Sequence, residues 1–215
     1  MTEPDRKSRQ TILDRIGRAL ADRPKPAPVS RDYRPAGADP GVDLLDLLTD
    51  RLIDYRAAVH RCPAAAAADR IGELLGDRPV VVPTGFPAEL LAEVPNWRPD
   101  DPPLTVAELD QAGGVLSTCA LAVAETGTLV LDAGPGQGRR ALTLVPDYHL
   151  AVVRADQVVF NVPEAIERLA GSRTLTWISG PSATSDIELA RVEGVHGPRT
   201  LVVLLLEPEQ PGSRQ

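Results

Sequence analysis

The 215-residue chain has few aromatic side chains, two cysteines and no excess of positive charge. Aromatic residues make up 3% of the sequence, so the stacking platforms that bind single-stranded nucleic acids are scarce. The net charge of −7 argues against sequence-independent binding to phosphate backbones, which depends on clustered lysine and arginine. The longest apolar runs fall far short of the roughly 20 residues that span a bilayer. We therefore expect neither nucleic-acid binding nor a membrane span.

The two cysteines, Cys62 and Cys119, lie in unlike contexts and lack the spacing of metal ligands. Iron–sulfur clusters are typically held by about four thiolates, so this chain alone cannot hold one. The polar N-terminus is not followed by the apolar segment of a secretory signal. We therefore expect a cytoplasmic, reducing setting in which the two thiols stay unpaired.

The chain is long enough for one sizeable domain with an appendage. Residues Ser8 to Leu20 carry apolar side chains at helical spacing, and the segment from Pro24 to Pro40 is rich in proline, as in an extended arm. We expect an N-terminal helix and arm over residues 1–40, an α/β domain over 41–208 and a tail over 209–215. The helix would dock on a partner or fold back on its own domain, and the sequence leaves both open.

Within the domain, two helices are expected ahead of the sheet, one continuing from Val42 to Val59 and one over Ala64–Leu75. Strand-like runs at Ser117–Ala124 and Thr128–Leu131 flank Glu125-Thr126-Gly127 and predict a hairpin. Short helices are expected at Ala88–Val94, Thr105–Gln111 and Pro163–Leu169, and β-rich segments at Pro79–Pro83, Ala141–Val145, His149–Val153, Gln157–Phe160, Thr174–Ile178 and Arg199–Leu206. This alternation predicts an α/β fold with a mixed, largely parallel sheet flanked by helices.

The loop from Gly180 to Glu188 is the strongest candidate ligand site, because it follows an apolar strand and concentrates hydroxyls and carboxylates. Its candidate substrate-binding residues are Ser182, Thr184, Ser185, Asp186 and Glu188. Hydroxyls and backbone N–H groups in such a turn can hold an anionic or carbonyl group. The competing interpretation is an ordinary turn and helix cap, for which the same residue types are preferred.

Two further turns offer polar groups. Glu125, at the tip of the predicted hairpin, is a candidate nucleophile or general base, with a solvated turn residue as the alternative. The glycine-rich loop that begins at Gly134 ends in Arg139 and Arg140, whose guanidinium groups suit a carboxylate or phosphate. The alternative for that loop is a surface segment with two solvated arginines.

Two of the three histidines are presented by turns. His149 follows Pro146-Asp-Tyr, and His196 lies between Val195 and Gly197. Both are candidate catalytic residues, because an imidazole can transfer protons near neutral pH. The spacing of the histidines supports no metal site. Because these polar turns abut predicted strand ends, where clefts form in α/β proteins, we expect them to gather around one pocket.

Four of these segments, taken in order and spacing, resemble the LUD domain family. They are Glu125-Thr-Gly-Thr128, Pro146-Asp-Tyr-His149, Gly180-Pro-Ser-Ala-Thr-Ser-Asp-Ile-Glu188 and Gly194-Val-His-Gly-Pro198. The resemblance covers roughly Leu44 to Glu207. It implies a fold similar to the NagB, RpiA and CoA-transferase group and a part in the oxidation of L-lactate to pyruvate. It also implies separate iron–sulfur partner proteins, since this chain lacks the cysteine-rich region of longer relatives.

Three functional hypotheses follow. In the first, the chain is a catalytic subunit of an L-lactate-oxidising system, with Arg139 or Arg140 pairing with the substrate carboxylate and a histidine taking the hydroxyl proton. In the second, it is a non-catalytic assembly or regulatory subunit that binds a small anion. In the third, it is a CoA transferase or sugar-phosphate isomerase, with Glu125 in a turn similar to that of the transferase nucleophile. The resident cofactor, if any, is left open.

Overall fold

The structure is a computed structural model that describes residues 3–22, 27–37, 41–169, 171, 174–181, 183–184, 192–193 and 197–208. The chain comprises two units, Met1–Arg34 and Pro35–Gln215. In the first, α1 (Glu3–Ala19) confirms the expected N-terminal helix, and its apolar residues Ile12, Leu13 and Ile16 are exposed. Within the described residues, no helix is both long and apolar enough to traverse a membrane.

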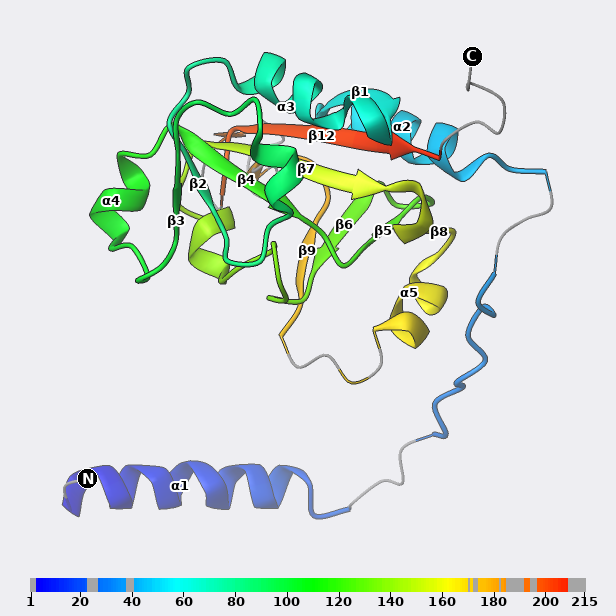
Figure 1. The fold of residues 1–215 in the computed structure, drawn as a ribbon. Coiled ribbons are helices and arrows are strands. Elements are labelled where there is room, and N and C mark those ends of the chain that lie inside the picture. Colours follow the sequence, from blue (N-terminus) through cyan, green and yellow to red (C-terminus); the bar gives the residue numbers. More distant parts are fainter. Residues whose placement is uncertain are drawn as a thin grey trace. The chain divides into compact units, whose positions relative to one another are not determined.

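In the second unit, six of the described strands form a sheet in the order β1-β12-β7-β4-β2-β3, and every pairing is parallel (Figure 1). The strands are β1 (Ala58–Pro63), β2 (Val80–Val82), β3 (Trp97–Pro99), β4 (Gly114–Thr118), β7 (Tyr148–Arg154) and β12 (Thr200–Glu207). The central strands β7 and β12 are buried over most of their length, as the continuous apolar runs of the sequence predict.

A smaller sheet carries the hairpin, in the order β8-β5-β6-β9. Its strands are β5 (Leu121–Val123), β6 (Thr128–Leu131), β8 (Val158–Val159) and β9 (Thr176–Ile178). The expected strand Ser117–Ala124 is thus divided, because the chain leaves the parallel sheet after Thr118 and enters the smaller one at Leu121. β5 and β6 are antiparallel, and Gly127 in their turn has a φ of 58°, so the predicted hairpin is confirmed. A short pair, β10 (Ala183–Thr184) and β11 (Val192–Glu193), is separate.

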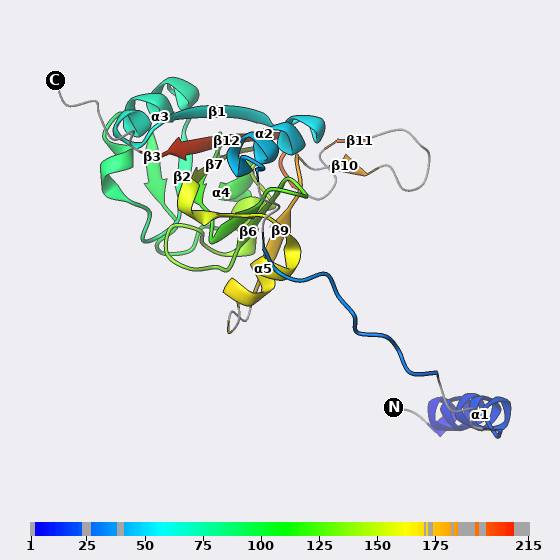
Figure 2. The ribbon, with the colours of Figure 1, turned by 90° about the vertical axis from the view of Figure 1, so that its right-hand side faces the viewer.

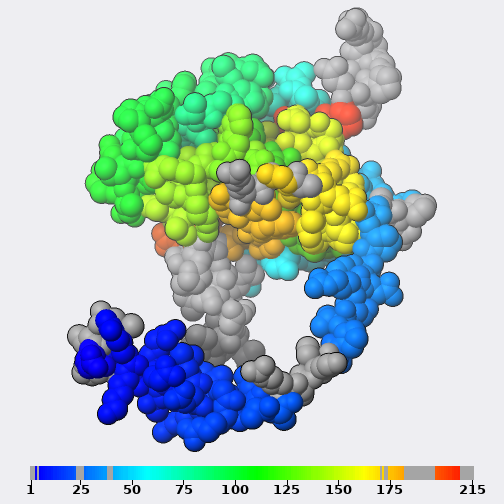
Figure 3. Space-filling view, turned by 90° about the horizontal axis from the view of Figure 1, so that it is seen from below, coloured from blue at the N-terminus to red at the C-terminus, as the bar shows by residue number. Residues whose placement is uncertain are grey.

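Each face of the parallel sheet packs against a different set of elements and forms its own hydrophobic core (Figures 1 and 2). The helices are α2 (Leu44–Asp54), α3 (Ala67–Leu75), α4 (Val106–Asp110) and α5 (Val162–Arg168), and the 3-10 turns are η1 (Ala64–Ala66), η2 (Ala88–Leu91), η3 (Arg140–Thr143) and η4 (Ala155–Gln157). Along β12, Val202 and Leu204 pack in the core that contains α3, whereas Leu201 and Val203 pack in the core that contains α2 and the smaller sheet. Alternate side chains of each central strand therefore point into separate cores. Figure 3 shows α5 and β9 side by side on one face of this unit.

The helix expected to run to Val59 ends at Asp54, so one strand, β1, lies between the two predicted helices. Arg56 takes a left-handed φ of 67°, and N–H groups of Arg56 and Ala57 donate to the carbonyls of Ile53 and Leu52. This pairing is a Schellman helix end, and it turns the chain into β1. The segment Ala141–Val145 was also expected to be β-rich, but it is largely the 3-10 turn η3, which buries Leu142.

Two local predictions are confirmed at the level of single hydrogen bonds. Thr105 and Glu108 form the capping box expected at the start of α4. Asn161 caps α5 by accepting a hydrogen bond from the backbone of Glu164, and its Nδ2 donates to the carbonyls of Pro35 and Gly37. The end of the proline-rich segment is thereby attached to the α/β unit.

Candidate functional site

A cavity of about 200 Å³ lies beside the amino ends of β7 and β12, next to the end of β9. Its walls include Arg140, Thr143, His149, Ser179, Gly180 and Pro198. These residues lie in or next to four of the turns that the sequence singles out. The cavity therefore gathers His149, Arg140 and the first residues of the Gly180 loop.

His149 is the second residue of β7 and is 1% exposed. Its Nε2 lies 2.8 Å from Oγ of Ser117, a fully buried residue of the neighbouring strand β4. The pKa of His149 is lowered to about 4, first because burial disfavours the charged imidazole and second because Arg140 places a positive charge nearby. His149 is therefore neutral at neutral pH, with Ser117 satisfying one ring nitrogen.

Arg140 begins η3 and lies at the exposed side of the cavity. Its Nη1 donates to the carbonyl and to Oγ1 of Thr143, at 2.8 and 3.0 Å. These two bonds fix the guanidinium group against a buried threonine. A positive charge held in this way at a small cavity suits an anionic group such as a carboxylate.

The turn that follows β9 is attached to the smaller sheet. Oγ1 of Thr128 lies 2.8 Å from Oγ of Ser179, which lines the cavity. Gly180 has a φ of 84°, and a Cβ at this position would lie 2.6 Å from Cβ of Tyr55. The chain therefore needs glycine here, where it begins the predicted ligand loop.

The predicted ligand loop continues beyond Pro181, and most of its candidate substrate-binding residues are outside the described part of the chain. Ser182, Ser185, Asp186 and Glu188 lie outside the described residues, and Thr184 is described only as backbone in β10. The cavity is bordered by Gly180 and Pro181, from which this loop continues.

His196 also lies outside the described residues, but Gly197 and Pro198, which follow it, line the cavity. Arg199 then forms an ion pair with Asp147, with 2.7 Å between Nη2 and Oδ2. Hydrogen bonds from Arg199 hold the pKa of Asp147 below its ordinary value. This pair joins the turn before β12 to the turn before β7.

Arg139 turns away from the cavity that Arg140 lines. Its Nε and Nη2 donate to the two carboxylate oxygens of Asp100 at 2.7 and 2.9 Å, and Nη2 also donates to the carbonyl of Leu104. The side chain of Asp100 is only 7% exposed. The structure thus gives Arg139 a buried carboxylate of the protein as its partner.

Glu125 lies in the turn between β5 and β6, half-buried, and its backbone N–H donates to the carbonyl of Phe160 at 2.9 Å. It is not among the described residues that line the cavity. The hairpin reaches the cavity instead through Thr128 and its bond to Ser179.

Sequence reasoning missed Ser117, Thr143 and Ser179. Ser117 was assigned to an apolar strand, and only the pairing of β4 with β7 shows that it faces His149. Thr143 falls in the segment expected to be β-rich, and Ser179 directly precedes the predicted loop. Within the described part of the chain, no three His, Cys, Asp or Glu side chains are grouped so as to hold a metal ion.

Comparison with known proteins identifies the family. The LUD domain profile matches residues 105–206. Lactate utilization protein C of Deinococcus radiodurans is 49% identical over 193 residues, which cover 87% of this chain and 86% of that protein. The uncharacterized protein YkgG of Escherichia coli is 34% identical over 76% of this chain and 78% of its own length.

A solved structure agrees with the same assignment. The crystal structure of a DUF162 family protein from Deinococcus radiodurans matches with a TM-score of 0.67 and 43% identity, covering 76% of this chain and 96% of that chain. At this identity the likeness extends to sequence as well as fold. The chain belongs to the LUD domain family.

Proposed function

We propose that this protein takes part in lactate utilisation, as a component of a system that oxidises L-lactate to pyruvate. The observation that carries the proposal is the 49% identity to a lactate utilization protein C over 87% of the chain. The cavity beside β7 supports it, because a volume of about 200 Å³ admits a small acid of lactate's size.

In this proposal the cavity binds the acid through its two polar ends. Arg140 pairs with the carboxylate, and His149, which contacts Ser117, lines the same cavity. Oxidation breaks the C2–H and O–H bonds of lactate and releases two protons and two electrons. His149, neutral at neutral pH, takes the hydroxyl proton, the C2 proton is released to water, and the two electrons pass to an acceptor on a partner.

The acceptor in this proposal is an iron–sulfur protein. The chain has two cysteines, and clusters are typically held by about four thiolates. Electron transfer then requires a separate subunit, and the reaction takes place in the cytoplasm. Both the partner and the compartment are part of the proposal.

A second candidate is a non-catalytic subunit that binds a small anion and regulates or assembles the complex. One observation favours it: a histidine with a pKa of about 4 is a weak base, and general bases work best when their pKa is near the working pH. Such a histidine is well suited to accept a hydrogen bond from a bound hydroxyl without removing its proton.

Deletion of the gene in its host, followed by growth on L-lactate or on a non-lactate carbon source, tests the proposal. We expect loss of growth on lactate alone, restored by the wild-type gene and not by an Arg140→Gln variant. Normal growth of the deletion strain on lactate would refute the role in lactate utilisation. Affinity purification of the wild type and of His149→Gln then separates the two candidates: lost lactate oxidation with an intact complex supports catalysis, and unchanged turnover supports the non-catalytic subunit.

A further inference from the structure

A second, larger cavity of about 500 Å³ lies at the carboxyl ends of the parallel strands, whereas the first cavity lies at their amino ends. It is lined by Thr118, the last residue of β4, by Arg154, the last residue of β7, and by Gly85, which follows β2. His149 and Arg154 are both in β7, so this strand separates the two cavities by about 16 Å of extended chain. The larger cavity is therefore distinct from the one described above.

The chain topology places this cavity at a switch point of the sheet. From β2 the chain passes through η2 to β3 on one side, and β4 lies on the other side of β2. The turn η2 packs in the core of α3, whereas α4, between β3 and β4, packs in a core on the other face. In open α/β sheets, ligands bind outside the carboxyl ends of strands where connections diverge in this way.

The cavity wall contains a buried amide whose donor is unused. Gln137 is 7% exposed, and its Oε1 accepts a hydrogen bond from the backbone N–H of Asp132 at 2.7 Å. This bond fixes the orientation of the amide, because only the oxygen can accept. Nε2 of Gln137 donates to no group in the described part of the chain, and neither does Oγ1 of Thr118, which lines the same cavity. Buried polar groups are normally satisfied, so the free Nε2 of Gln137 indicates a missing partner, and the partly buried hydroxyl of Thr118 lies in the same cavity.

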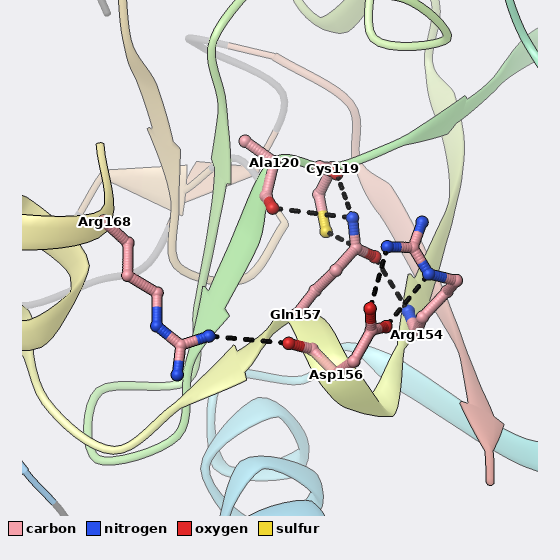
Figure 4. A network of polar contacts seen from close by, with 6 residues as sticks. All are labelled: Cys119, Ala120, Arg154, Asp156, Gln157 and Arg168. Atoms are coloured by element: carbon pink, nitrogen blue, oxygen red, sulfur yellow. Dashed lines mark hydrogen bonds and ion pairs between the residues drawn. The ribbon is translucent and has the colours of Figure 1, made fainter. Parts of the chain in front are cut away.

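Two arginines, Arg154 and Arg168, also line the cavity, and both contact Asp156 (Figure 4). Arg154 uses Nε and Nη2 on the carboxylate of Asp156, at 2.9 and 3.1 Å. Arg168 uses Nη1 on the carbonyl of Asp156 and Nη2 on Glu164. Among the described residues, Nη1 of Arg154 and Nε of Arg168 have no acceptor. The carboxylates of Asp156 and Glu164 are paired with these arginines, and Asp132, which also lines the cavity, accepts at Oδ1 from the backbone N–H of Gly134 at 2.9 Å. The free N–H donors are therefore those of Gln137, Arg154 and Arg168.

The frame of the cavity is rigid. Gln157 donates from Nε2 to the carbonyl of Cys119 at 2.7 Å and accepts at Oε1 from the backbone of Arg154 at 2.9 Å (Figure 4). Gly136 has a φ of 74°, and a Cβ there would lie 2.8 Å from Oγ1 of Thr118. The loop that carries Gln137 is therefore packed directly against the end of β4. A site built in this way is formed before its ligand arrives.

We propose that this cavity binds a hydroxylated organic anion, with its hydroxyls at Gln137 and Thr118 and its carboxylate or phosphate at Arg154 and Arg168. The unused donors suit oxygen acceptors on the ligand, a ligand hydroxyl can donate to the carboxylate of Asp132, and the guanidinium groups place the negative charge. This cavity has a volume of about 500 Å³, against about 200 Å³ for the cavity assigned to lactate, so it admits a larger ligand. The site goes beyond the proposed lactate function and does not depend on it.

Calorimetric titration of the full chain with three probes of one carbon skeleton tests the proposal: sorbitol, gluconate and sorbitol 6-phosphate. We expect one or both anions to bind at least about tenfold more tightly than sorbitol. Preference for gluconate identifies a carboxylate ligand, and preference for sorbitol 6-phosphate identifies a phosphate ligand. Absence of binding by both anions, or equal binding of all three probes, would overturn the proposal.

Two variants locate the binding. Gln137→Glu keeps the acceptor for the Asp132 N–H but replaces the free donor with a negative charge. We expect this variant to bind the anion about tenfold more weakly, or weaker still. Arg168→Gln acts on a half-exposed side chain, so it tests the site if Gln137→Glu does not fold. Arg70→Gln, which removes a half-exposed guanidinium from α3, is the matched control and should bind as the wild type does. Anion binding unchanged in Arg168→Gln would place it elsewhere and refute the site.

Discussion

Oγ of Ser117 and Nε2 of His149 lie 2.8 Å apart in the interior, joining β4 to β7 through a fully buried polar contact. The parallel pairing of these strands places Ser117 opposite Ala151, so the two polar side chains meet diagonally on one face of the sheet. A buried imidazole is tolerated there as the neutral form, with the serine as its partner. The arrangement couples the protonation of His149 to the stability of the fold.

Acid should destabilise the wild-type protein through His149. Its pKa is about 4 in the folded chain and about 6.5 when unfolded, so the unfolded state binds the proton first as the pH falls. Stability should therefore decrease between about pH 6.5 and pH 4, by about 3 kcal/mol in total from this group. Urea unfolding at a series of pH values measures the effect.

His149→Gln is the comparison for this experiment, since glutamine has no proton to gain in this range. Its unfolding free energy should be lower than that of the wild type at pH 7 and should change less between pH 6.5 and pH 4. His60→Gln, at a partly exposed histidine of β1, is a second comparison. Burial and Arg70 also lower the pKa of His60, so this variant should lose a small part of the slope, whereas His149→Gln should lose most of it. Identical slopes in wild type and His149→Gln would show that His149 titrates normally.

The adjacent arginines should respond differently to the same substitution. Arg139→Gln removes two hydrogen bonds from the nearly buried carboxylate of Asp100, and we expect a loss of about 2 kcal/mol in unfolding free energy. Arg140→Gln should change stability by less than about 1 kcal/mol but weaken lactate binding about tenfold. Chemical denaturation and lactate titration of both variants measure the two effects. The reverse pattern would assign the ligand contact to Arg139.

The elements with continuous apolar runs were predictable from the sequence, and those set by one distant contact were not. β12 and β7 follow from their composition, and α4 from its capping box. The end of α2 depends on the left-handed backbone of Arg56, which interrupts a helical periodicity that formally continues to Val59. Local pattern alone cannot show that interruption, because β1 gains its stability by pairing with β12.

The residues of the candidate site also fall into those that the sequence could predict and those that depend on distant contacts. The sequence predicts that His149 and one of Arg139 and Arg140 serve one pocket, and the structure brings His149 and Arg140 to one cavity. It cannot separate Arg139 from Arg140, because the difference lies in Asp100, 39 residues from Arg139. It also cannot find Ser117, whose diagonal contact with His149 depends on strand register. Distant pairing therefore decides which of the polar residues meet.

Both cysteines should be unreactive in the folded protein. Burial raises the pKa of Cys119 to about 12 and also raises the pKa of Cys62, so neither forms much thiolate near neutral pH. A thiol reagent at pH 7.5 should label the native chain on the order of a hundredfold more slowly than the guanidinium-unfolded chain. Cys62→Ser assigns any residual labelling. Rapid labelling of native Cys62→Ser would mean that Cys119 is accessible.

The hairpin turn should not tolerate a side chain at Gly127. Its φ of 58° is unfavourable for other residues, and a Cβ there would lie 2.8 Å from Cβ and 2.9 Å from the backbone carbonyl carbon of Arg51. We expect Gly127→Ala to lower the unfolding free energy by about 2–4 kcal/mol, because strain and a backbone clash act together. Gly17→Ala makes the same chemical change in α1, where nothing lies within 4 Å of the new Cβ, and should leave the unfolding midpoint of the α/β unit unchanged. Equal midpoints for the two variants would show that α2 does not constrain this turn.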